Sequence, residues 1–446
     1  MASPNTLWRP SALKTGLLWM STGNVCYAAC QWGVLIVLTK LGSPEQVGVF
    51  ASALAVTAPV VLLGNLQLRQ ILVTDRSRDF SFQDYAGLRL VTSLGSVLFL
   101  LGFYGISRSG LNTEGLVVVT IALAKGVESY NDIYQGFLHK HERMKTLATA
   151  QAIKGLASLA LVSAVFYVFR NVFLAGAALL LAWVIASLAY DIPHCLALWR
   201  SLRSESVDGR GMSLFRPRIS GRLLRLVKLA APLGVAIMFA SLATNIPRYS
   251  IRHYMGLGSL GIFAAVANLQ VSAATIVNSL AQVITPRLAT HYDQKQYRSF
   301  FRALAQAVLG LLGLGLTAVL VSLAAGRQIL TLIYNAEYAA YFPLLTLTMV
   351  AATVWFVAAI LGCALTAMRV LNVQLVLAGS ACLVIHVACS LLVPLYGLSG
   401  ACGAIICGGV VQSCGSAAIM LYSQRSLRAP MSRIGRWTIP FVSPAE

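Results

Sequence analysis

Charged residues are scarce in this chain: they make up 11% of its 446 residues, and only 14 residues are acidic. A soluble protein of this length usually carries charge on about a quarter of its residues. The chain also lacks a GxxxxGK[ST] phosphate loop, an HExxH metal motif and a serine nucleophile elbow. These absences argue against a soluble globular enzyme and against nucleotide hydrolysis.

Paired cysteine motifs are missing as well. None of the nine cysteines belongs to a CxxC pair, and nearly all lie inside apolar runs without a histidine cluster beside them. This pattern is typical of small buried apolar residues rather than of disulfides or metal ligands. We therefore expect no cofactor. The first apolar run continues from about residue 17 to residue 38, so we interpret it as a retained span and not as a cleaved signal.

Long apolar runs recur along the chain. Hydrophobic residues make up 58% of the chain, the mean hydropathy is +0.75, and runs of roughly 20 residues recur, each long enough to cross a bilayer. The sequence predicts an all-α polytopic membrane protein with about 12 transmembrane helices. The expected spans are 14–39, 47–72, 84–106, 115–138, 147–169, 171–196, 226–250, 258–286, 301–325, 341–366, 373–393 and 399–422.

Positive charge is distributed unequally between the two sides of these spans. With the N-terminus taken as cytoplasmic, 26 of the 34 Lys and Arg residues fall on inner segments, six on outer segments and two inside spans. The bias predicts that both termini are cytoplasmic. It also explains the net charge of +20 through attraction to membrane lipid, without nucleic acid as a partner. Arg69, near the inner end of the second span, is interpreted as a snorkelling side chain.

The longest connecting segment divides six expected spans from six. The predicted domains are an N-terminal six-helix bundle (1–196), a cytoplasmic connector (197–225), a C-terminal six-helix bundle (226–422) and a cytoplasmic tail (423–446).

A weak internal repeat crosses the connector. VGVFASALAVTAPVVLLGNL, from Val47, matches LGIFAAVANLQVSAATIVNS, from Leu260, so that Gly48 aligns with Gly261 at a constant offset. Because each half holds an even number of spans, the halves enter from the same side. We predict a parallel repeat about an axis along the membrane normal, with a central cleft between the bundles.

Three ionisable residues interrupt the fourth expected span. Lys125 is about 15 Å deep if this span enters at residue 115, at 1.5 Å per residue. At 100° per residue, Glu128 and Asp132 share its helix face. Lys154, in the fifth span, lies at a depth where it could reach either carboxylate. Two interpretations stay open: the stripe lines a cavity, or it is an ion-pair cluster that holds helices in register.

A second cluster, SLATNIPRYSIRHYMG, starts at Ser241. Arg248 and Arg252 fall on one helical face with Ser241 and Thr244. Pro247 should kink or break the helix just before Arg248. Arg248 either snorkels to the interface or contacts an anion, since a guanidinium matches phosphate geometry.

Three stretches resemble the bacterial polysaccharide flippases of the multidrug, oligosaccharidyl-lipid and polysaccharide exporter superfamily. They are LTKLGSPEQVGVFASALAVTAPV from Leu38, YNDIYQGFLHKHERMKTLATAQAIKG from Tyr130, and NIPRYSIRHYMGLGSLGIFAAVANL from Asn245, followed by VITPRLATHYDQ from Val283. The third is the most specific, and the resemblance covers about residues 10–425.

The resemblance implies a non-enzymatic transporter in the bacterial inner membrane. It would flip an undecaprenyl-pyrophosphate-linked oligosaccharide from the inner to the outer leaflet by alternating access, in a pathway with glycosyltransferases and a polymerase. The family's cationic cavity would be carried onto Lys125, Lys154 and Arg248. Glu128 and Asp132 depart from that pattern and leave open a charged sugar or coupling to a proton or sodium gradient.

Three alternative functions would require different sequence features. A drug exporter of the same superfamily would favour acidic cavity residues over Lys125 and Arg248. A polysaccharide polymerase or ligase should have a large outer loop, whereas the expected outer loops here are short. A membrane scaffold would need no charged stripe at the midplane.

Overall fold

The computed structural model describes residues 10–75, 80–107, 112–205, 221–370 and 372–428, and this part of the chain contains helices and no strand. The elements are α1 (Pro10–Leu41), α2 (Pro44–Asn65), α3 (Leu68–Thr74), α4 (Phe82–Ser107), α5 (Thr113–Lys140), α6 (Met144–Phe169), α7 (Val172–Ala186), a π-helical turn (Ser187–Asp191), α8 (Ile192–Glu205), α9 (Arg222–Asp293), α10 (Tyr297–Ile333), a 3₁₀ turn (Ala336–Tyr341), α11 (Phe342–Ala367) and α12 (Asn372–Arg428).

These helices make twelve membrane crossings. In the described residues, nine segments are long and apolar enough to span a bilayer. Two of them, in α9 and α12, each hold two crossings that meet at a glycine with left-handed backbone, Gly256 (φ 84°) and Gly397 (φ 58°). The remaining crossing is α5, whose charged residues keep it out of that set. The predicted all-α membrane fold with about 12 spans is confirmed.

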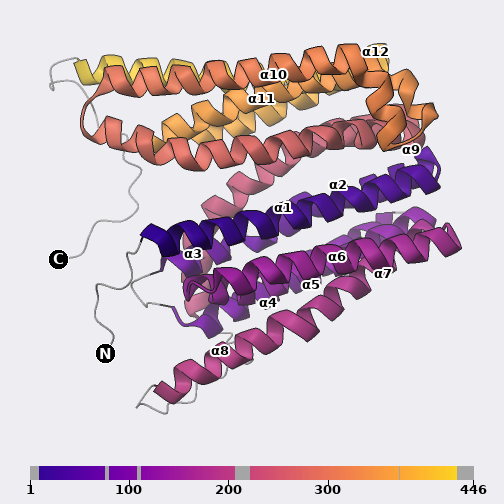
Figure 1. The fold of residues 1–446 in the computed structure, drawn as a ribbon, viewed down its shortest axis with the longest axis horizontal. Helices are drawn as coiled ribbons and strands as arrows, with labels where there is room; N and C mark the ends of the chain where they lie inside the picture. The colour runs from indigo at the N-terminus through magenta and orange to yellow at the C-terminus, as the bar shows by residue number, and fades with distance from the viewer. Residues whose placement is uncertain (1–9, 76–79, 108–111, 206–220, 371, 429–446) are drawn as a thin grey trace.

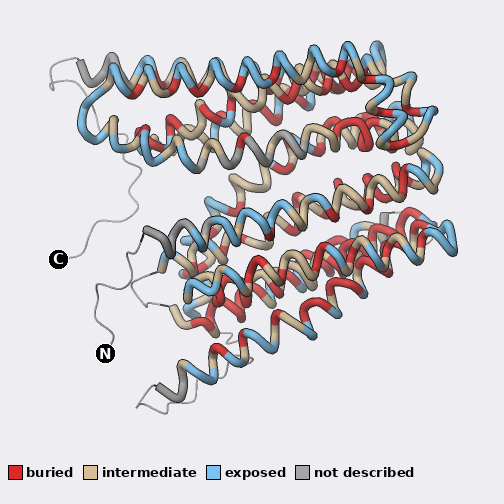
Figure 2. Tube along the Cα trace, viewed as in Figure 1, coloured by how far each residue is buried: buried red, intermediate tan, exposed pale blue. Residues whose placement is uncertain are grey.

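The helices form two bundles that lie side by side (Figure 1). One is built from α1 to α8, and the other from most of α9 together with α10 to α12. Large apolar side chains are exposed along α10, including Leu309, Leu316 and Leu320, as the pale blue stretches of that helix show in Figure 2. Such a surface is stable against hydrocarbon and not against water. The outer flank of α10 therefore faces lipid.

The two bundles touch through equivalent positions of the predicted repeat. A Cβ added to Gly48 would lie 1.9 Å from the Leu257 carbonyl oxygen. A Cβ added to Gly261 would lie 1.9 Å from the carbonyl oxygen of Pro44. Pro44 and Leu257 stand at the same sequence offset as Gly48 and Gly261, so the contact is reciprocal. A reciprocal contact is what a two-fold axis produces, and it places that axis between α2 and the second half of α9.

The first half of α9 crosses from one bundle to the other (Figure 1). Leu226 and Ala230, near its start, pack in the apolar core of the N-terminal bundle with Leu66 and Tyr134. Further along, Ala243 packs in a core of the C-terminal bundle. Helix α9 therefore ties the bundles together, and the packing boundary falls inside this helix.

Two expectations differ from the structure. The second span is not one helix, because Leu66 (φ 48°) and Gln67 (φ 52°) adopt left-handed backbone and separate α2 from α3. Pro247 does not break α9, whose non-helical residue is Gly256. The alternative, a kink at Pro247, stays a prediction. The cytoplasmic connector (197–225) stays a prediction: α8 continues into its first part, to Glu205, and residues 206–220 lie outside the described residues. Most of residues 423–446, which were predicted to form a cytoplasmic tail, lie outside the described residues too.

Candidate functional site

A polar cavity of about 840 Å³ lies within the N-terminal bundle. Its walls come from α1 to α6, and they include the whole charged stripe of α5 together with Lys154 of α6. Ser129 and Gln135 line the cavity beside the stripe, whereas Tyr134 points into the apolar core, as the helical spacing predicts. Lys125, Glu128, Asp132 and Lys154 are therefore brought to one cavity. Contact of these four residues with a substrate stays a prediction.

Glu128 is held between two lysines. Its Oε2 accepts from Lys125 Nζ at 2.8 Å, and its Oε1 accepts from Lys154 Nζ. The Tyr27 hydroxyl also donates to Oε1, at 3.2 Å. Both ammonium groups lie over the Trp183 ring, Lys125 at 4.9 Å and Lys154 at 4.3 Å from its centroid. A ring face attracts cations, so Trp183 also stabilises the positions of both ammonium groups.

Asp132 is held between two arginines. Its Oδ1 accepts from Arg69 Nη1 at 3.0 Å, and its Oδ2 accepts from Arg89 Nη2 at 2.8 Å. Arg89 is fully buried, and its Nη1 donates to the Asn65 carbonyl oxygen at 2.9 Å and to Asn65 Oδ1 at 2.6 Å. Arg69 Nη1 also reaches Gln135 Oε1 at 3.4 Å. Arg89 thus joins Asp132 to the residue at which α2 ends.

The break between α2 and α3 explains this arrangement. A helix end leaves carbonyl groups without an intrahelical partner, and inside a membrane they need another donor. Arg89 supplies that donor to Asn65, and the turn at Leu66 and Gln67 directs Arg69 into the cavity. The sequence reasoning missed both arginines as site residues, because it placed them at the inner ends of spans. The available signal was an Arg pair one helix away from an intramembrane Asp.

The cavity carries an excess of positive charge. Four cationic side chains line it (Arg69, Arg89, Lys125 and Lys154), against the two carboxylates of Glu128 and Asp132. Each carboxylate oxygen already accepts a hydrogen bond from a cation. The carboxylates therefore position the cations, and the two uncompensated positive charges face the cavity. Such a site attracts an anion with oxygen acceptors, since charge-assisted hydrogen bonds are the strong ones.

Arg248 and Arg252 do not line this cavity. Arg252 Nη2 pairs with Glu114 Oε1, at the start of α5, at 2.7 Å. Arg248 Nη1 donates to Asn245 Oδ1 at 2.9 Å, and it forms no ion pair with a carboxylate in the described parts of the chain. The structure thus separates the two sequence clusters, and a role for Arg248 and Arg252 in substrate binding stays a prediction.

Known proteins of similar sequence indicate the family to which this chain belongs. The sequence profile of the family described as "Polysaccharide biosynthesis protein" matches residues 13–292. This chain belongs to that family. It is 26% identical over 320 residues to the capsular polysaccharide biosynthesis protein CapF of Staphylococcus aureus, with 72% of this chain and 77% of CapF covered.

The fold is that of the transporters of the MOP superfamily. The structure superposes on an inward-facing multidrug resistance MATE family transporter with a TM-score of 0.71 at 14% identity, over 90% of this chain and 95% of that one. With an outward-facing structure of a MATE family transporter the TM-score is 0.60 at 14% identity, over 94% and 96%. Family and fold together identify a multi-pass membrane protein of a polysaccharide biosynthesis family, built on a transporter fold.

Proposed function

We propose that this protein flips a polyprenyl-pyrophosphate-linked oligosaccharide from the inner to the outer leaflet of the bacterial inner membrane. The observation that carries the proposal is the pair of uncompensated positive charges in the cavity of the N-terminal bundle. A pyrophosphate diester carries one negative charge on each phosphate, so the charges of headgroup and cavity are opposite in sign and equal in magnitude. Membership of a polysaccharide biosynthesis family supports the same substrate class.

The transport problem explains why such a cavity is needed. A pyrophosphate and a glycan cannot cross hydrocarbon alone, because each unsatisfied polar group costs several kcal/mol, roughly 2–7. Arg69 and Lys125 are partly exposed to the cavity, so they can meet the phosphates while the lipid tail stays in the bilayer. No covalent bond changes, so we propose a transporter and not an enzyme. Glycosyltransferases would supply the substrate and a polymerase would consume it.

The way in which the two bundles meet supports alternating access. The better superposition on the inward-facing neighbour supports an inward-facing state. In this state the bundles are joined at the ends that the charge bias predicts to be outer, through Gly48, Gly261 and the Arg252–Glu114 ion pair. We propose that this contact opens when the cavity turns outward. The chain has no nucleotide-binding motif, so we place the energy source in a proton or sodium gradient.

The glycine contact yields a matched test. Gly48→Ala places a methyl group where the Leu257 carbonyl now lies, whereas Gly95→Ala, in α4, meets no atom within 4 Å. We expect Gly48→Ala to force the bundles apart and to lower export at least about fivefold, since an overpacked contact costs typically 1–3 kcal/mol. Gly95→Ala should export normally. Surface polysaccharide per unit of membrane-inserted protein is the measurement, and equal output from the two variants would refute the tight contact.

The second candidate is a cation-coupled multidrug exporter, which the MATE neighbours favour. Ligand charge separates the two functions. Purified protein should bind a short-chain polyprenyl-pyrophosphate oligosaccharide and should not bind a cationic dye such as ethidium. In cells that lack their own exporter, the chain should restore surface polysaccharide. Saturable ethidium binding with no binding of the pyrophosphate lipid would favour the drug exporter.

A further inference from the structure

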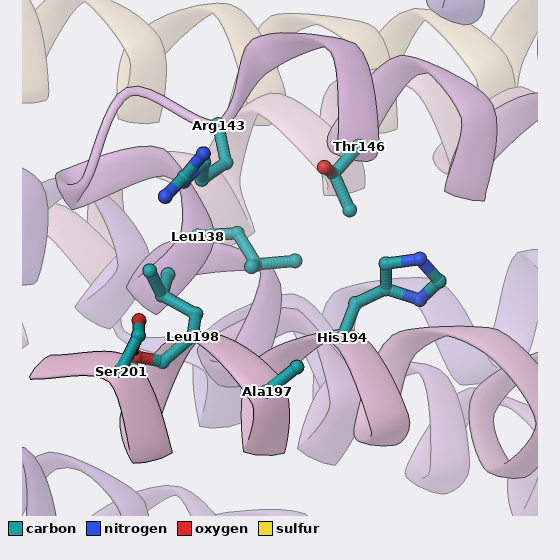
Figure 3. A pocket seen from close by; sticks show the side chains of 7 residues that line it. All are labelled: Leu138, Arg143, Thr146, His194, Ala197, Leu198 and Ser201. Carbon is teal, nitrogen blue, oxygen red and sulfur yellow. Dashed lines mark hydrogen bonds between the residues drawn. The ribbon is translucent and has the colours of Figure 1, made fainter. Parts of the chain in front are cut away.

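A second, smaller hollow lies outside the transport cavity and shares no residue with it. Its volume is about 270 Å³, and it is formed by the turn between α5 and α6 on one side and by α8 on the other (Figure 3). Leu138, Ala197 and Leu198 make an apolar floor. The rim is polar and is formed by Arg143, Thr146, His194 and Ser201. An apolar floor beneath a polar rim is the form of a site for an amphiphile.

The cationic end of the hollow is Arg143. Its side chain is exposed and forms no ion pair with a carboxylate in the described residues. Arg143 is also the N-cap of α6, and its side chain makes no capping hydrogen bond to the first turn of that helix. Backbone N–H groups and the positive end of a helix dipole attract anions. The Thr146 hydroxyl, one turn along α6, is also part of the rim.

The opposite end of the hollow presents an acceptor. His194 Nδ1 lies 2.8 Å from the Tyr190 carbonyl oxygen, so Nδ1 donates and the neutral ring carries its lone pair on Nε2. The ring is stacked on Tyr190 with centroids 4.0 Å apart, which fixes its orientation. Figure 3 shows Arg143 and His194 at opposite sides of the hollow, with Leu138 between them. The two ends of the hollow can therefore bind different chemical groups: an anion at Arg143 and a hydroxyl at His194.

The position of the hollow points to a membrane lipid. The span of α6 begins at Met144, next to Arg143, and the span that contains α8 ends at Leu202, next to Ser201. The hollow is therefore level with one face of the bilayer. Lys140, Lys145 and Arg200 lie in the same segments. By the charge bias this face is cytoplasmic, where anionic lipids concentrate and where basic pockets between helices bind their headgroups.

We infer that this hollow is a binding site for an anionic glycerophospholipid of the inner leaflet with a hydroxylated headgroup, such as phosphatidylglycerol. The phosphodiester accepts from the Arg143 guanidinium and from the first turn of α6. A headgroup hydroxyl donates to His194 Nε2, and the glycerol backbone covers Leu138 and Leu198. The inference does not depend on the substrate of the transport cavity.

Lipid retention tests the site. The purified full-length protein is placed in nanodiscs of phosphatidylglycerol and phosphatidylethanolamine, extracted in mild detergent, and its retained lipids are counted by native mass spectrometry. We expect wild type to retain phosphatidylglycerol selectively. Arg143→Gln should lower that retention about tenfold, since a charge-assisted contact is lost. Lys145→Gln is the matched control: Lys145 stands two residues after Arg143 in the chain, but its ammonium group lies over the Trp19 ring, 5.5 Å from its centroid.

A second variant separates the two ends of the hollow. His194→Phe keeps an aromatic ring beside Tyr190 and removes Nε2. This variant should still retain anionic lipid, but it should no longer prefer phosphatidylglycerol over phosphatidic acid, which has no headgroup hydroxyl.

Three results would overturn the site. The first is equal phosphatidylglycerol retention by wild type and Arg143→Gln. The second is displacement of the lipid by millimolar inorganic phosphate, which would make the ligand free phosphate. The third is replacement of the retained phospholipid by added polyprenyl phosphate, which would make the hollow a substrate site.

Discussion

Neutralising Glu128 together with its two lysines should leave the protein in the membrane and nearly abolish export. The variant is Lys125→Met, Lys154→Met and Glu128→Gln. It leaves no unpaired charge, because both cations that bind Glu128 are removed with it. Tyr27 can still donate to the Gln side chain. The cavity loses one of its two uncompensated positive charges, and a lost charge-assisted hydrogen bond is worth about 1.5–3 kcal/mol, so transport should fall at least about tenfold.

The alternative, that these residues only hold helices in register, predicts the opposite outcome. A neutral, well-packed replacement of a buried ion pair is often neutral or stabilising. Export would then return to the wild-type level in the triple variant, while Lys154→Met alone would lower protein abundance. The measurement is surface polysaccharide per unit of membrane-inserted protein in cells without a native exporter. Wild-type output from the triple variant would remove Lys125 and Lys154 from the site.

Arg89→Leu should destabilise the protein more than any other single change in this cavity. Arg89 is fully buried and binds both Asp132 and the end of α2 at Asn65. Removing one partner of a buried pair costs about 3–5 kcal/mol. Asp132→Asn added to Arg89→Leu should recover part of the loss, because the carboxylate no longer lacks a partner. Arg287→Leu, at an exposed position of α9, is the control and should be silent.

Thermal unfolding of the purified protein in one detergent measures these differences. We expect the midpoint to fall for Arg89→Leu, to recover partly in the double variant, and to stay unchanged for Arg287→Leu. If Arg89→Leu unfolds at the wild-type temperature, then Arg89 does not hold the break between α2 and α3.

The stripe on α5 could be predicted from sequence because helical spacing alone fixes which side chains share a face. Lys125, Glu128 and Asp132 line one cavity for that reason. Arg69 and Arg89 could not be found in this way. Their role depends on the interruption after Asn65, and Leu66 and Gln67 give no glycine or proline signal for a helix break. Packing against neighbouring helices imposes that backbone, and packing cannot be read from one chain segment.

The break in α9 gives the converse case. Pro247 was expected to kink or break the helix because it lacks an N–H donor. A single proline is tolerated when the surrounding helices support the backbone, whereas a left-handed φ strains any residue except glycine. The turn therefore falls at Gly256. The repeat was more informative: it paired Gly48 with Gly261, and these glycines meet where the bundles touch.

The most direct test of the account is headgroup movement in proteoliposomes. Purified protein is reconstituted with a fluorescent polyprenyl-pyrophosphate oligosaccharide, and dithionite quenching from outside reports how much of the lipid has changed leaflet. We predict that wild type moves this lipid across, that the triple variant at Lys125, Glu128 and Lys154 does so at least about tenfold more slowly, and that a neutral lipid with the same glycan is not moved. Equal rates for the neutral and the pyrophosphate lipid, or for wild type and the triple variant, would contradict the central claim that cavity cations carry the pyrophosphate.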